Sequence, residues 1–417
     1  MIRYPDALKI ISDAAIGRLL QIESLPLEKC LGRVSAVDVI SQCYVPAFDN
    51  SAMDGFAINC ESKPSRAVVA GYIAAGENIN HDPAIAGNQP VAVKIMTGAP
   101  VPEFYFNSVI KVEDVLIEGD TIIIPDNILN KTGVGDNIRR KGEDFKPGQI
   151  VVRAGTRLGA HHIMALASVG VAEVAVRQPP RVGVLSTGKE IVPHDVPELE
   201  PGMVRNSTAP FIMAALSEIG AEARYYGVVE DDPEQFKEIM FRMMDDGADI
   251  IITTGAVSMG DHDFVADSLR SIDATVLFHK CAIRPGKPIL FALAPKRDDG
   301  GQAVVFSMPG NPVSTAVGLR FFLEPYIRSV LGCEDEVPTN AFLKNNVKKP
   351  DWLRAFYKAR LAMKDGSVVV DILPGQASFM ISPMLDSNAW VVLKEDCGEF
   401  PPGVLVEVAP LRSGLYD

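Results

Sequence analysis

The segment from Arg181 to Gly332 alternates short apolar runs with helix-length stretches, and this alternation limits the fold more than any other feature. The runs RVGVLSTG, ADIIITTG and AVVFSMPG are continuous apolar strands that end in a glycine turn. Helical patterns such as NSTAPFIMAALSEIG and PEQFKEIMFRMMDDG lie between the first two strands. Strands and helices in this order are typical of a parallel sheet covered by helices on both faces. We therefore predict an α/β domain in this part of the chain.

Other parts of the chain have different patterns. Residues 5–22 carry apolar side chains at helical spacing, with Pro5 where a first helical turn accepts proline. Short strand-like runs and turn residues predict a mainly β domain from about residue 45 to 152, and 147–176 predicts strand, helix, strand. After about Cys333 strands return, including a hairpin around KDGS. A chain of 417 residues is too long for one core, so several domains are expected.

Composition narrows the class of protein. The formal net charge of −13 argues against general nucleic-acid binding, which needs a basic surface. The 6 cysteines are scattered without a C-x-x-C pair, which predicts neither a disulfide framework nor a zinc site and suits a reducing compartment. The opening MIRYPDALKI does not resemble a signal peptide, and no apolar run is long enough to cross a membrane. We expect a cytoplasmic protein that binds neither nucleic acid nor membranes.

Polar, glycine-rich loops follow the predicted strands of the α/β domain. They are STGKE from Ser186, VVEDDP with Asp231, TTGAVSMGDHD with Gly255, Ser258 and Asp263, and SMPGNP. Ligands of open α/β sheets bind beyond the carboxyl ends of the strands. Glycine turns and free N–H groups bind phosphate or other oxyanions, and carboxylates bind hard cations such as Mg²⁺. The loops match neither the P-loop nor the dinucleotide-binding motif.

The segment HKCAIRPGKPI carries three cations among apolar residues, namely Lys280, Arg284 and Lys287. In an extended conformation the first two share a face, whereas Lys287 points away unless the Pro-Gly turn redirects it. These side chains are either ordinary surface cations or groups that neutralise a polyanion beside the acidic loops. We favour the second interpretation.

The segment PAFDNSAMDGFAI places Asp49 and Asp54 between apolar flanks. It is either a solvated turn between two strands or a pair of carboxylates held around a charged ligand.

Seven motifs occur in a fixed order: FDNSAMDGFAI, IMTGAPVP, NIRRKGEDF, LSTGKEIV, DIIITTGAVSMGDHDF, RPGKPI and MPGNPVS. Together they resemble the molybdopterin molybdenumtransferase family, to which the gephyrin E domain is related. The resemblance spans almost the whole chain. It implies four domains: 1–22 with 180–332 as the α/β molybdopterin-binding domain, 23–45 with 149–179 as an elongated connector, 46–148 as a β domain with the DNSAMDG segment, and 333–417 as a β-barrel-like domain.

The resemblance also implies a reaction. Family members take adenylylated molybdopterin and molybdate, use a divalent metal such as Mg²⁺, and release AMP and molybdenum cofactor. They are homodimers whose active sites lie between the α/β domain of one subunit and the DNSAMDG domain of the other. The dithiolene sulfurs belong to the substrate, which agrees with the absence of a cysteine cluster in this sequence.

Motif by motif, the resemblance and the loop pattern nominate site residues. Asp54 is the chemical residue of its segment, while Asp49 and Asn50 are expected to fix the turn through local hydrogen bonds to the backbone. The full set is Asp54, Thr97, Asp144 and Glu190 as catalytic residues; Ser186, Thr187, Gly255, Ser258, Lys280, Arg284, Lys287, Pro309, Pro312 and Arg354 as substrate-binding residues; and Asp231 and Asp263 as metal ligands.

Two positions depart from the family pattern. Ala256 stands where a glycine is common, and it strains the loop if that position needs a positive φ. Arg284 stands where a lysine is usual; it keeps the charge but changes the hydrogen-bonding geometry.

Two other functions are compatible with parts of the pattern. One is a molybdopterin adenylyltransferase that shares the α/β domain and uses ATP. The other is a non-catalytic scaffold that keeps the fold and binds a peptide. The sequence does not distinguish molybdate from tungstate, which are tetrahedral oxyanions of similar size.

Overall fold

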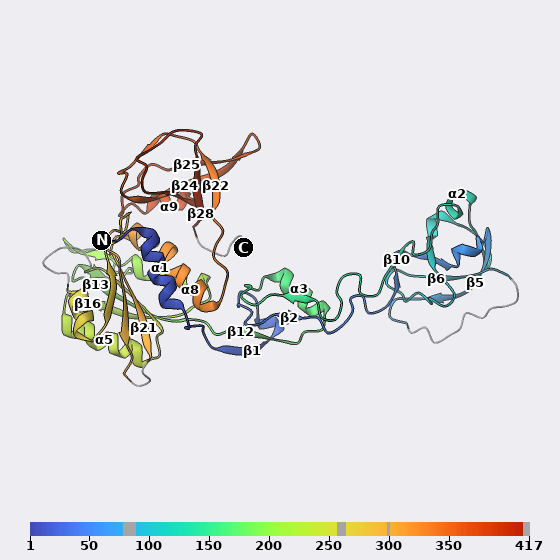
Figure 1. Cartoon of the computed structure of the whole chain (residues 1–417), viewed down its shortest axis with the longest axis horizontal. Coiled ribbons are helices and arrows are strands. Elements are labelled where there is room, and N and C mark those ends of the chain that lie inside the picture. Colours follow the sequence, from blue (N-terminus) through green and yellow to red (C-terminus); the bar gives the residue numbers. More distant parts are fainter. Residues whose placement is uncertain (78–88, 257–263, 298–300, 412–417) are drawn as a thin grey trace.

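The computed structural model describes residues 1–77, 89–256, 264–297 and 301–411. These residues form an elongated molecule with an α/β module at one end, a β-barrel module packed beside it, a narrow connector and a distal β module at the other end (Figure 1). Within the described ranges, no helix combines the length and the apolar character needed to cross a bilayer.

A six-stranded sheet organises the α/β module, in the order β16-β13-β17-β21-β20-β18. Strands β16, β13, β17 and β21 are parallel, whereas β20, next to the edge strand β18, runs antiparallel to both of its neighbours, β21 and β18. The expected α/β fold is therefore confirmed, with a mixed sheet in place of a fully parallel one. Its strands are β13 (Arg181–Thr187), β16 (Glu222–Val229), β17 (Ile250–Thr254), β18 (Thr275–His279), β20 (Leu290–Pro295) and β21 (Gln302–Met308), and the short strands β14 (Ile191–Val192), β15 (Val204–Arg205) and β19 (Ile283–Arg284) lie outside the sheet.

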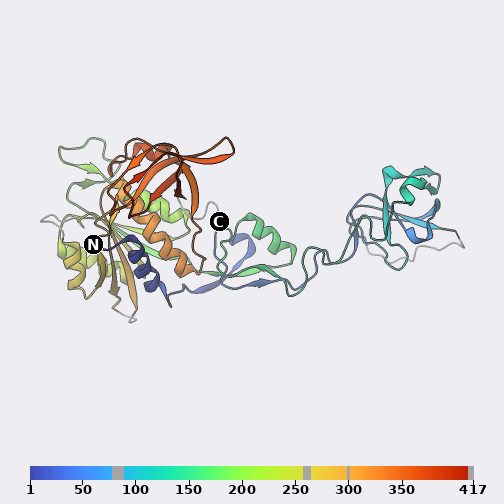
Figure 2. The same ribbon diagram turned by 45° about the horizontal axis from the view of Figure 1, so that its top comes forward.

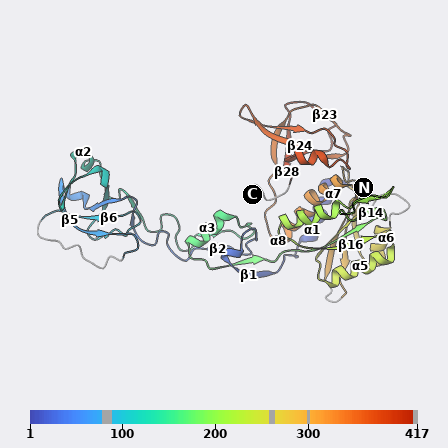
Figure 3. The same cartoon turned by 180° about the vertical axis from the view of Figure 1, so that it is seen from behind.

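Helices cover both faces of this sheet, as predicted. One face packs on α5 (Pro233–Asp245) and α6 (Val265–Ser271), where Met240, Met243 and Met244 are buried. The other face packs on α1 (Tyr4–Ala15), α4 (Thr208–Glu218), α7 (Pro312–Gly318), the π-helical turn η4 (Leu319–Leu323) and α8 (Glu324–Leu331). Figure 3 shows α1, α7 and α8 together on this side. The predicted helix over 5–22 is too long, because Gly17 adopts a φ of 74° just after α1 and residues 22–26 form a strand.

The connector consists of an outgoing and a returning part of the chain. Outgoing strands β1 (Ile22–Pro26) and β2 (Val39–Ile40), with the turn η1 (Leu27–Lys29), pair with returning strands β12 (Glu173–Arg177) and β11 (Ile150–Val152). Helix α3 (Ala160–Ser168) packs on these strands and completes a small core. The distal module is thus inserted between the two parts of the connector (Figure 2).

The distal module is built on a six-stranded sheet in the order β7-β4-β6-β5-β9-β8 and has hydrophobic clusters of its own. Its elements are β3 (Asn50–Ser51), β4 (Gly55–Ile58), η2 (Cys60–Ser62), β5 (Arg66–Ile73), β6 (Val91–Ile95), β7 (Ser108–Lys111), η3 (Val112–Asp114), β8 (Leu116–Glu118), β9 (Thr121–Ile123), α2 (Asp126–Leu129) and β10 (Ile138–Arg139).

The C-terminal module closes into a barrel, because β24 pairs with both β25 and β26. The predicted hairpin is present: Lys364 pairs with Ser367, and Asp365 and Gly366 have positive φ angles, as a tight hairpin turn requires. The elements are β22 (Thr339–Leu343), β23 (Val347–Lys348), β24 (Arg354–Lys364), β25 (Ser367–Ile372), α9 (Ser382–Asp386), β26 (Ala389–Leu393), β27 (Glu399–Phe400) and β28 (Leu405–Pro410).

Candidate active site

Three loops meet at the carboxyl edge of the α/β sheet. The Gly255 N–H, just after β17, donates to the Met308 carbonyl at the end of β21 (3.0 Å), and the Thr187 hydroxyl of β13 donates to the Thr254 carbonyl (3.1 Å). A Cβ atom on Gly255 would lie 2.4 Å from the Thr187 carbonyl oxygen, so only glycine fits between these loops. The predicted convergence of loops is therefore present for Thr187, Gly255 and the residues after Met308.

A buried hydroxyl network lies beneath these loops. The Asn206 amide donates to the Ser186 hydroxyl (3.0 Å) and the Tyr225 hydroxyl (2.9 Å), and the Thr254 hydroxyl donates to Ser186 over 3.5 Å. Asn206 also accepts a bond from the Ala209 N–H (3.0 Å), which caps α4. Ser186 is only 2% exposed, so it supports the loop from below. The sequence gives no sign that Asn206 contacts Ser186, because the two residues are 20 positions apart.

Three loop residues at or near this edge have left-handed backbone conformations without being glycine. Asp231, Ala256 and Lys280 have φ angles of 47°, 46° and 74°. Such conformations are costly for residues with a Cβ atom and gather at functional sites. Position 256 does adopt a positive φ, which is the condition under which the sequence predicts strain from alanine, so this loop carries strain that a glycine would avoid.

Carboxylates at the edge divide into structural and available groups. Asp232 caps α5 by accepting bonds from the N–H groups of Glu234 (2.9 Å) and Gln235 (3.2 Å). Glu190 is exposed and Asp231 is half-buried. The described residues contain no group of three or more His, Cys, Asp or Glu side chains placed to hold a metal ion. The predicted residues Ser258 and Asp263 lie outside the described residues.

The cationic segment is not one extended strand, contrary to the sequence interpretation. Lys280 follows β18 with a left-handed φ, and Arg284 precedes a cis bond to Pro285. The Cys281 N–H donates to the Lys287 carbonyl (2.9 Å), which closes the segment into a loop. The Lys287 ammonium lies 5.9 Å from the centre of the Trp352 ring, a cation–π arrangement.

Arg354 is engaged in the interface between α1 and the barrel. Its Nε donates to Glu395 (2.7 Å), and its guanidinium lies 4.6 Å from the centre of the Tyr4 ring. Through the pairing of β19 with β24, its backbone adjoins Ile283. The structure therefore places Arg354 next to the cationic segment but pairs its charge internally.

The loop that follows β21 is exposed at Gly310 and Asn311, and one backbone hydrogen bond joins the helix after it to the barrel module. Pro309 is buried, and its carbonyl accepts a bond from the Thr315 hydroxyl (2.8 Å). Pro312 is the first residue of α7, and the N–H of the next residue, Val313, donates to the Ser378 carbonyl (3.0 Å). One N–H group of this helix start is thus already taken by the segment that leads from β25 to α9.

Asp54 and Thr97 come together in the distal module. One Asp54 carboxylate oxygen accepts bonds from the Thr97 N–H (2.7 Å) and hydroxyl (2.8 Å), and these bonds hold the pKa of Asp54 below its ordinary value. The carboxylate is exposed at the start of β4. A Cβ on Gly55 would lie 1.9 Å from the Ile110 carbonyl oxygen, which explains the Asp-Gly pair.

Asp49 fixes its turn through distant partners, so the predicted local hydrogen bonding is wrong for this residue. Its carboxylate accepts from Arg140 (2.5 Å) and from the Lys141 N–H (2.6 Å). Asn50 does bond locally, to the Phe48 carbonyl (3.2 Å). Asp144 is exposed and lies near the same turn, where its N–H donates to the Val45 carbonyl (2.9 Å).

Within one chain, the predicted site residues form two groups that lie far apart. Asp54, Thr97 and Asp144 belong to the distal module, and the other predicted residues that the structure describes belong to the α/β and barrel modules at the opposite end of the molecule (Figures 1 and 2). The connector lies between them.

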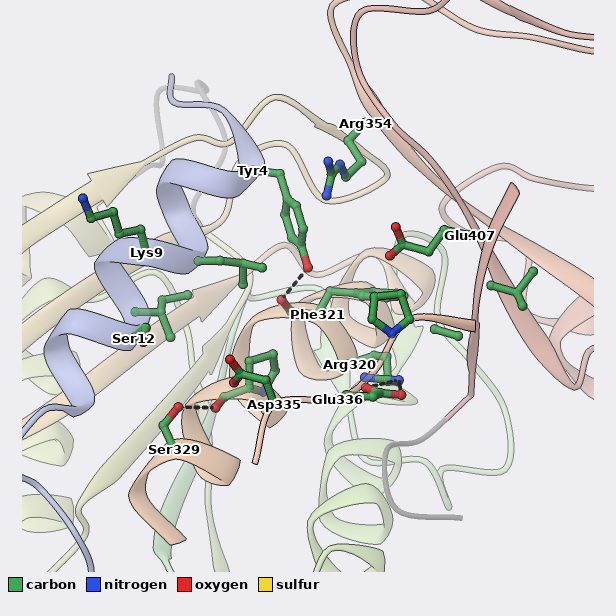
Figure 4. A pocket seen from close by; sticks show the side chains of 16 residues that line it. Tyr4, Lys9, Ser12, Arg320, Phe321, Ser329, Asp335, Glu336, Arg354 and Glu407 are labelled. Carbon is green, nitrogen blue, oxygen red and sulfur yellow. Dashed lines mark hydrogen bonds and ion pairs between the residues drawn. The ribbon is translucent and has the colours of Figure 1, made fainter. Parts of the chain in front are cut away.

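A hollow of about 390 Å³ lies elsewhere, between α1, η4, α8 and the barrel (Figure 4). Tyr4, Lys9, Arg320 and Glu407 line it, and Arg354 is the one predicted site residue in its wall. Arg320 is paired there with Glu336 in a two-pronged arrangement (2.6 and 2.7 Å). The cavity is therefore separate from the loops at the sheet edge.

The fold and the site together define a class: a multidomain α/β protein with glycine-lined loops and carboxylates at the carboxyl edge of its sheet, the usual place for a ligand of an open α/β sheet.

Comparison with known proteins identifies the family. Residues 2–170 match the MoeA N-terminal region (domain I and II), 183–329 match a probable molybdopterin binding domain, and 340–411 match the MoeA C-terminal region (domain IV). The chain is 38% identical to the molybdopterin molybdenumtransferase of Synechococcus elongatus over 99% of this chain and 100% of that protein. It is 33% identical to the Haemophilus influenzae protein of the same name, over 94% of each chain.

A solved structure gives the same answer. The molybdopterin biosynthesis MoeA protein of Pyrococcus horikoshii is similar with a TM-score of 0.81 and 26% identity, covering 98% of this chain and 100% of that one. The chain belongs to the molybdopterin molybdenumtransferase family, as its seven motifs predicted.

Proposed function

We propose that this protein inserts molybdate into adenylylated molybdopterin with the help of Mg²⁺, releasing AMP and molybdenum cofactor. The observation that carries the proposal is the sheet edge itself, where the ends of β13, β17 and β21 close around Gly255 and Lys280 follows β18 of the same sheet. An adenylylated pterin with phosphate groups and a tetrahedral oxyanion is an anionic substrate pair that such a surface suits.

We further propose a homodimer in which each active site combines two chains. The distal Asp54–Thr97 pair cannot take part in chemistry at the sheet edge of its own chain while the connector holds them at opposite ends (Figure 3). Exposed apolar side chains on the connector support contact with a second copy, since Leu31 is 66% exposed and Met164 is 71% exposed. The distal module of one chain would then face the sheet edge of its partner.

The residues have separate roles in this proposal. Lys280 and Arg284 neutralise substrate phosphate, with Lys287 beside them. Asp54, whose pKa is held down by Thr97, stays ionised at neutral pH and can accept a hydrogen bond or a proton from the incoming reactants. Glu190 and Asp144 are further exposed carboxylates for proton transfer.

Asp231 and Asp263 are the residues we expect to hold Mg²⁺. The half-buried carboxylate of Asp231 follows β16 and is an oxygen ligand of the kind that this ion prefers. When bound, the ion would screen the negative charges of phosphate and oxyanion from each other.

The cysteines support a compartment. All six lie in the described residues, none of them forms a disulfide, and three are buried. Cysteines that do not form disulfides favour the reducing cytoplasm, where we propose to place the protein.

The test is turnover by purified protein with adenylylated molybdopterin, molybdate and Mg²⁺. AMP and molybdenum cofactor should form together, and omission of molybdate or chelation of the metal should stop cofactor formation. Pyrophosphate release from ATP and molybdopterin would instead establish an adenylyltransferase. Absence of both reactions, in protein that is folded and dimeric, would favour the scaffold function.

A further inference from the structure

Lys358 is a buried lysine in the middle of β24, with 0% of its surface exposed. Its ammonium meets only backbone carbonyls, those of Gly375 (2.7 Å), Met380 (2.8 Å) and Ala377 (3.5 Å). Burying an ammonium is unfavourable unless its donors are satisfied, and burial lowers the pKa of Lys358. All three acceptors belong to one stretch of chain, residues 373–380, which we call the barrel segment.

The backbone of Lys358 binds the same segment. Its N–H donates to the Gln376 side chain (3.0 Å), and its carbonyl accepts from that side chain (2.9 Å) and from the Leu373 N–H (3.0 Å). Gln376 thereby occupies both hydrogen-bonding groups of one strand residue. The barrel segment has no helix or strand of its own, so its conformation depends on these bonds.

The barrel segment reaches the α/β module beside the sheet edge. The Ser378 carbonyl accepts the bond from the Val313 N–H (3.0 Å), next to Pro312 and the loop after β21. Val313 is only 1% exposed, so this contact is sealed from water. The segment that Lys358 binds is thus hydrogen-bonded to the helix that follows the loop after β21.

We propose that Lys358 is a positioning residue for the reaction: its ammonium holds the barrel segment against Val313 and so fixes the wall of the substrate site at residues 309–312. The proposal rests on the proposed function, because it assigns the sheet edge as the place where substrate binds. Lys358 itself does not touch substrate.

Lys349 provides a matched control within the same module. It is also a buried lysine, 8% exposed, and its ammonium donates to the Leu353 (2.7 Å) and Pro350 (3.2 Å) carbonyls. Loss of either buried ammonium should lower the melting temperature, because each leaves backbone carbonyls without their donor. Of these two lysines, only Lys358 has hydrogen-bond acceptors in the barrel segment.

The experiment compares wild type with Lys358→Met, Lys358→Arg, Gln376→Met and Lys349→Met as full-length proteins. First, amide exchange at Val313 is measured, which needs no substrate. Protection should fall in Lys358→Met and Gln376→Met, and persist in Lys349→Met. If Val313 keeps its protection from exchange in both Lys358→Met and Gln376→Met, the proposal that Lys358 holds the barrel segment against Val313 is wrong.

Turnover is then measured on the same proteins. The KM for adenylylated molybdopterin should rise on the order of tenfold in Lys358→Met, while kcat changes less, and Lys358→Arg should restore much of the loss. Equal kinetic losses in Lys358→Met and Lys349→Met would mark Lys358 as merely structural and overturn the positioning role. An inactive wild type would refute the proposed function, whereas an active wild type with an unchanged Lys358→Met would refute only the positioning role.

Discussion

The distal module and the edge of the α/β sheet hold their predicted residues in different ways. Asp54 depends on one partner, Thr97, and on a glycine that lets β4 pass close to β7. The sheet edge depends on several loops that bond to one another and on residues in strained left-handed conformations. A single carboxylate can thus be presented by a simple β sheet, whereas an anion-binding surface requires loops from several strands. Each region has its own core, so core packing does not align one with the other.

The largest expected effect tests whether the two regions act across chains. Asp54→Asn and Asp263→Asn should each lower insertion about 100-fold or more, because each removes a charge from every site. Co-expression gives mixed dimers in which one site has both substitutions and the other has neither. Doubly tagged mixed dimers should recover up to about half of the wild-type activity per dimer. No recovery in verified mixed dimers would mean that both residues act from one chain or that Asp54 is only a turn residue.

A smaller effect isolates the cations of the sheet edge. Lys280→Ala should raise the KM for adenylylated molybdopterin about tenfold at low salt, because one phosphate-neutralising charge is lost. The difference in KM between Lys280→Ala and the wild type should become smaller as the salt concentration rises, because screening weakens the contact between Lys280 and phosphate in the wild type. The exposed Lys364, at the hairpin of the barrel module, is the matched control, and Lys364→Ala should leave the KM unchanged. A lower melting temperature with unchanged KM in Lys280→Ala would assign Lys280 a structural role.

The simpler geometry of the distal module makes its titration predictable. Thr97→Val removes the hydroxyl bond to Asp54 but keeps the backbone bond, so the pKa of Asp54 should rise part of the way to its ordinary value. A lowered pKa stabilises the fold above the ordinary value, and this contribution is lost as pH falls through the lowered one. The acid limb of the activity profile should therefore move to higher pH in the variant. Carbon NMR titration of Asp54 checks this, with Thr132→Val as a control in the same module; an unchanged pKa would contradict it.

The smallest effect concerns strain at the sheet edge. Ala256→Gly should raise the free energy of unfolding by about 0.5–1 kcal/mol, because glycine accepts the φ of 46° without a Cβ clash. The same change at exposed Ala214, inside α4, should lower it by about 1 kcal/mol. Denaturant unfolding of both variants gives the comparison. Destabilisation by both changes would show that the loop around Ala256 is not strained.

Local patterns predicted much of this molecule, and long-range pairings account for what they missed. The apolar runs of β13, β17 and β21 and the KDGS hairpin followed from periodicity and turn chemistry. The reversed direction of β20 did not, because an apolar run does not encode the direction of its neighbours. Asp49 finds Arg140 91 positions away, a contact that local turn rules cannot anticipate.

The site residues divide in the same way. The motifs predicted Asp54 with Thr97 and the loops around Gly255. They gave no indication that Arg354 forms an ion pair with Glu395. Lys358 was missed altogether. The only signal was a lone lysine inside the apolar run of RAFYKARL, which is unfavourable on a buried strand unless the ammonium has partners.

The connector runs out to the distal module and back, so the distal module lies at the end of a long, narrow arm (Figures 1 and 2). The strand pair of the connector that is nearer to the distal module, β2 with β11, consists of a two-residue and a three-residue strand and has an irregular register. A small change of angle at this strand pair produces a larger displacement at the far end of the connector, so the position of Asp54 would be imprecise in an isolated chain. Contact of the distal module with another protein surface would then have to fix the position of Asp54. In the proposed homodimer, Asp54 would reach its working position only when the two chains assemble.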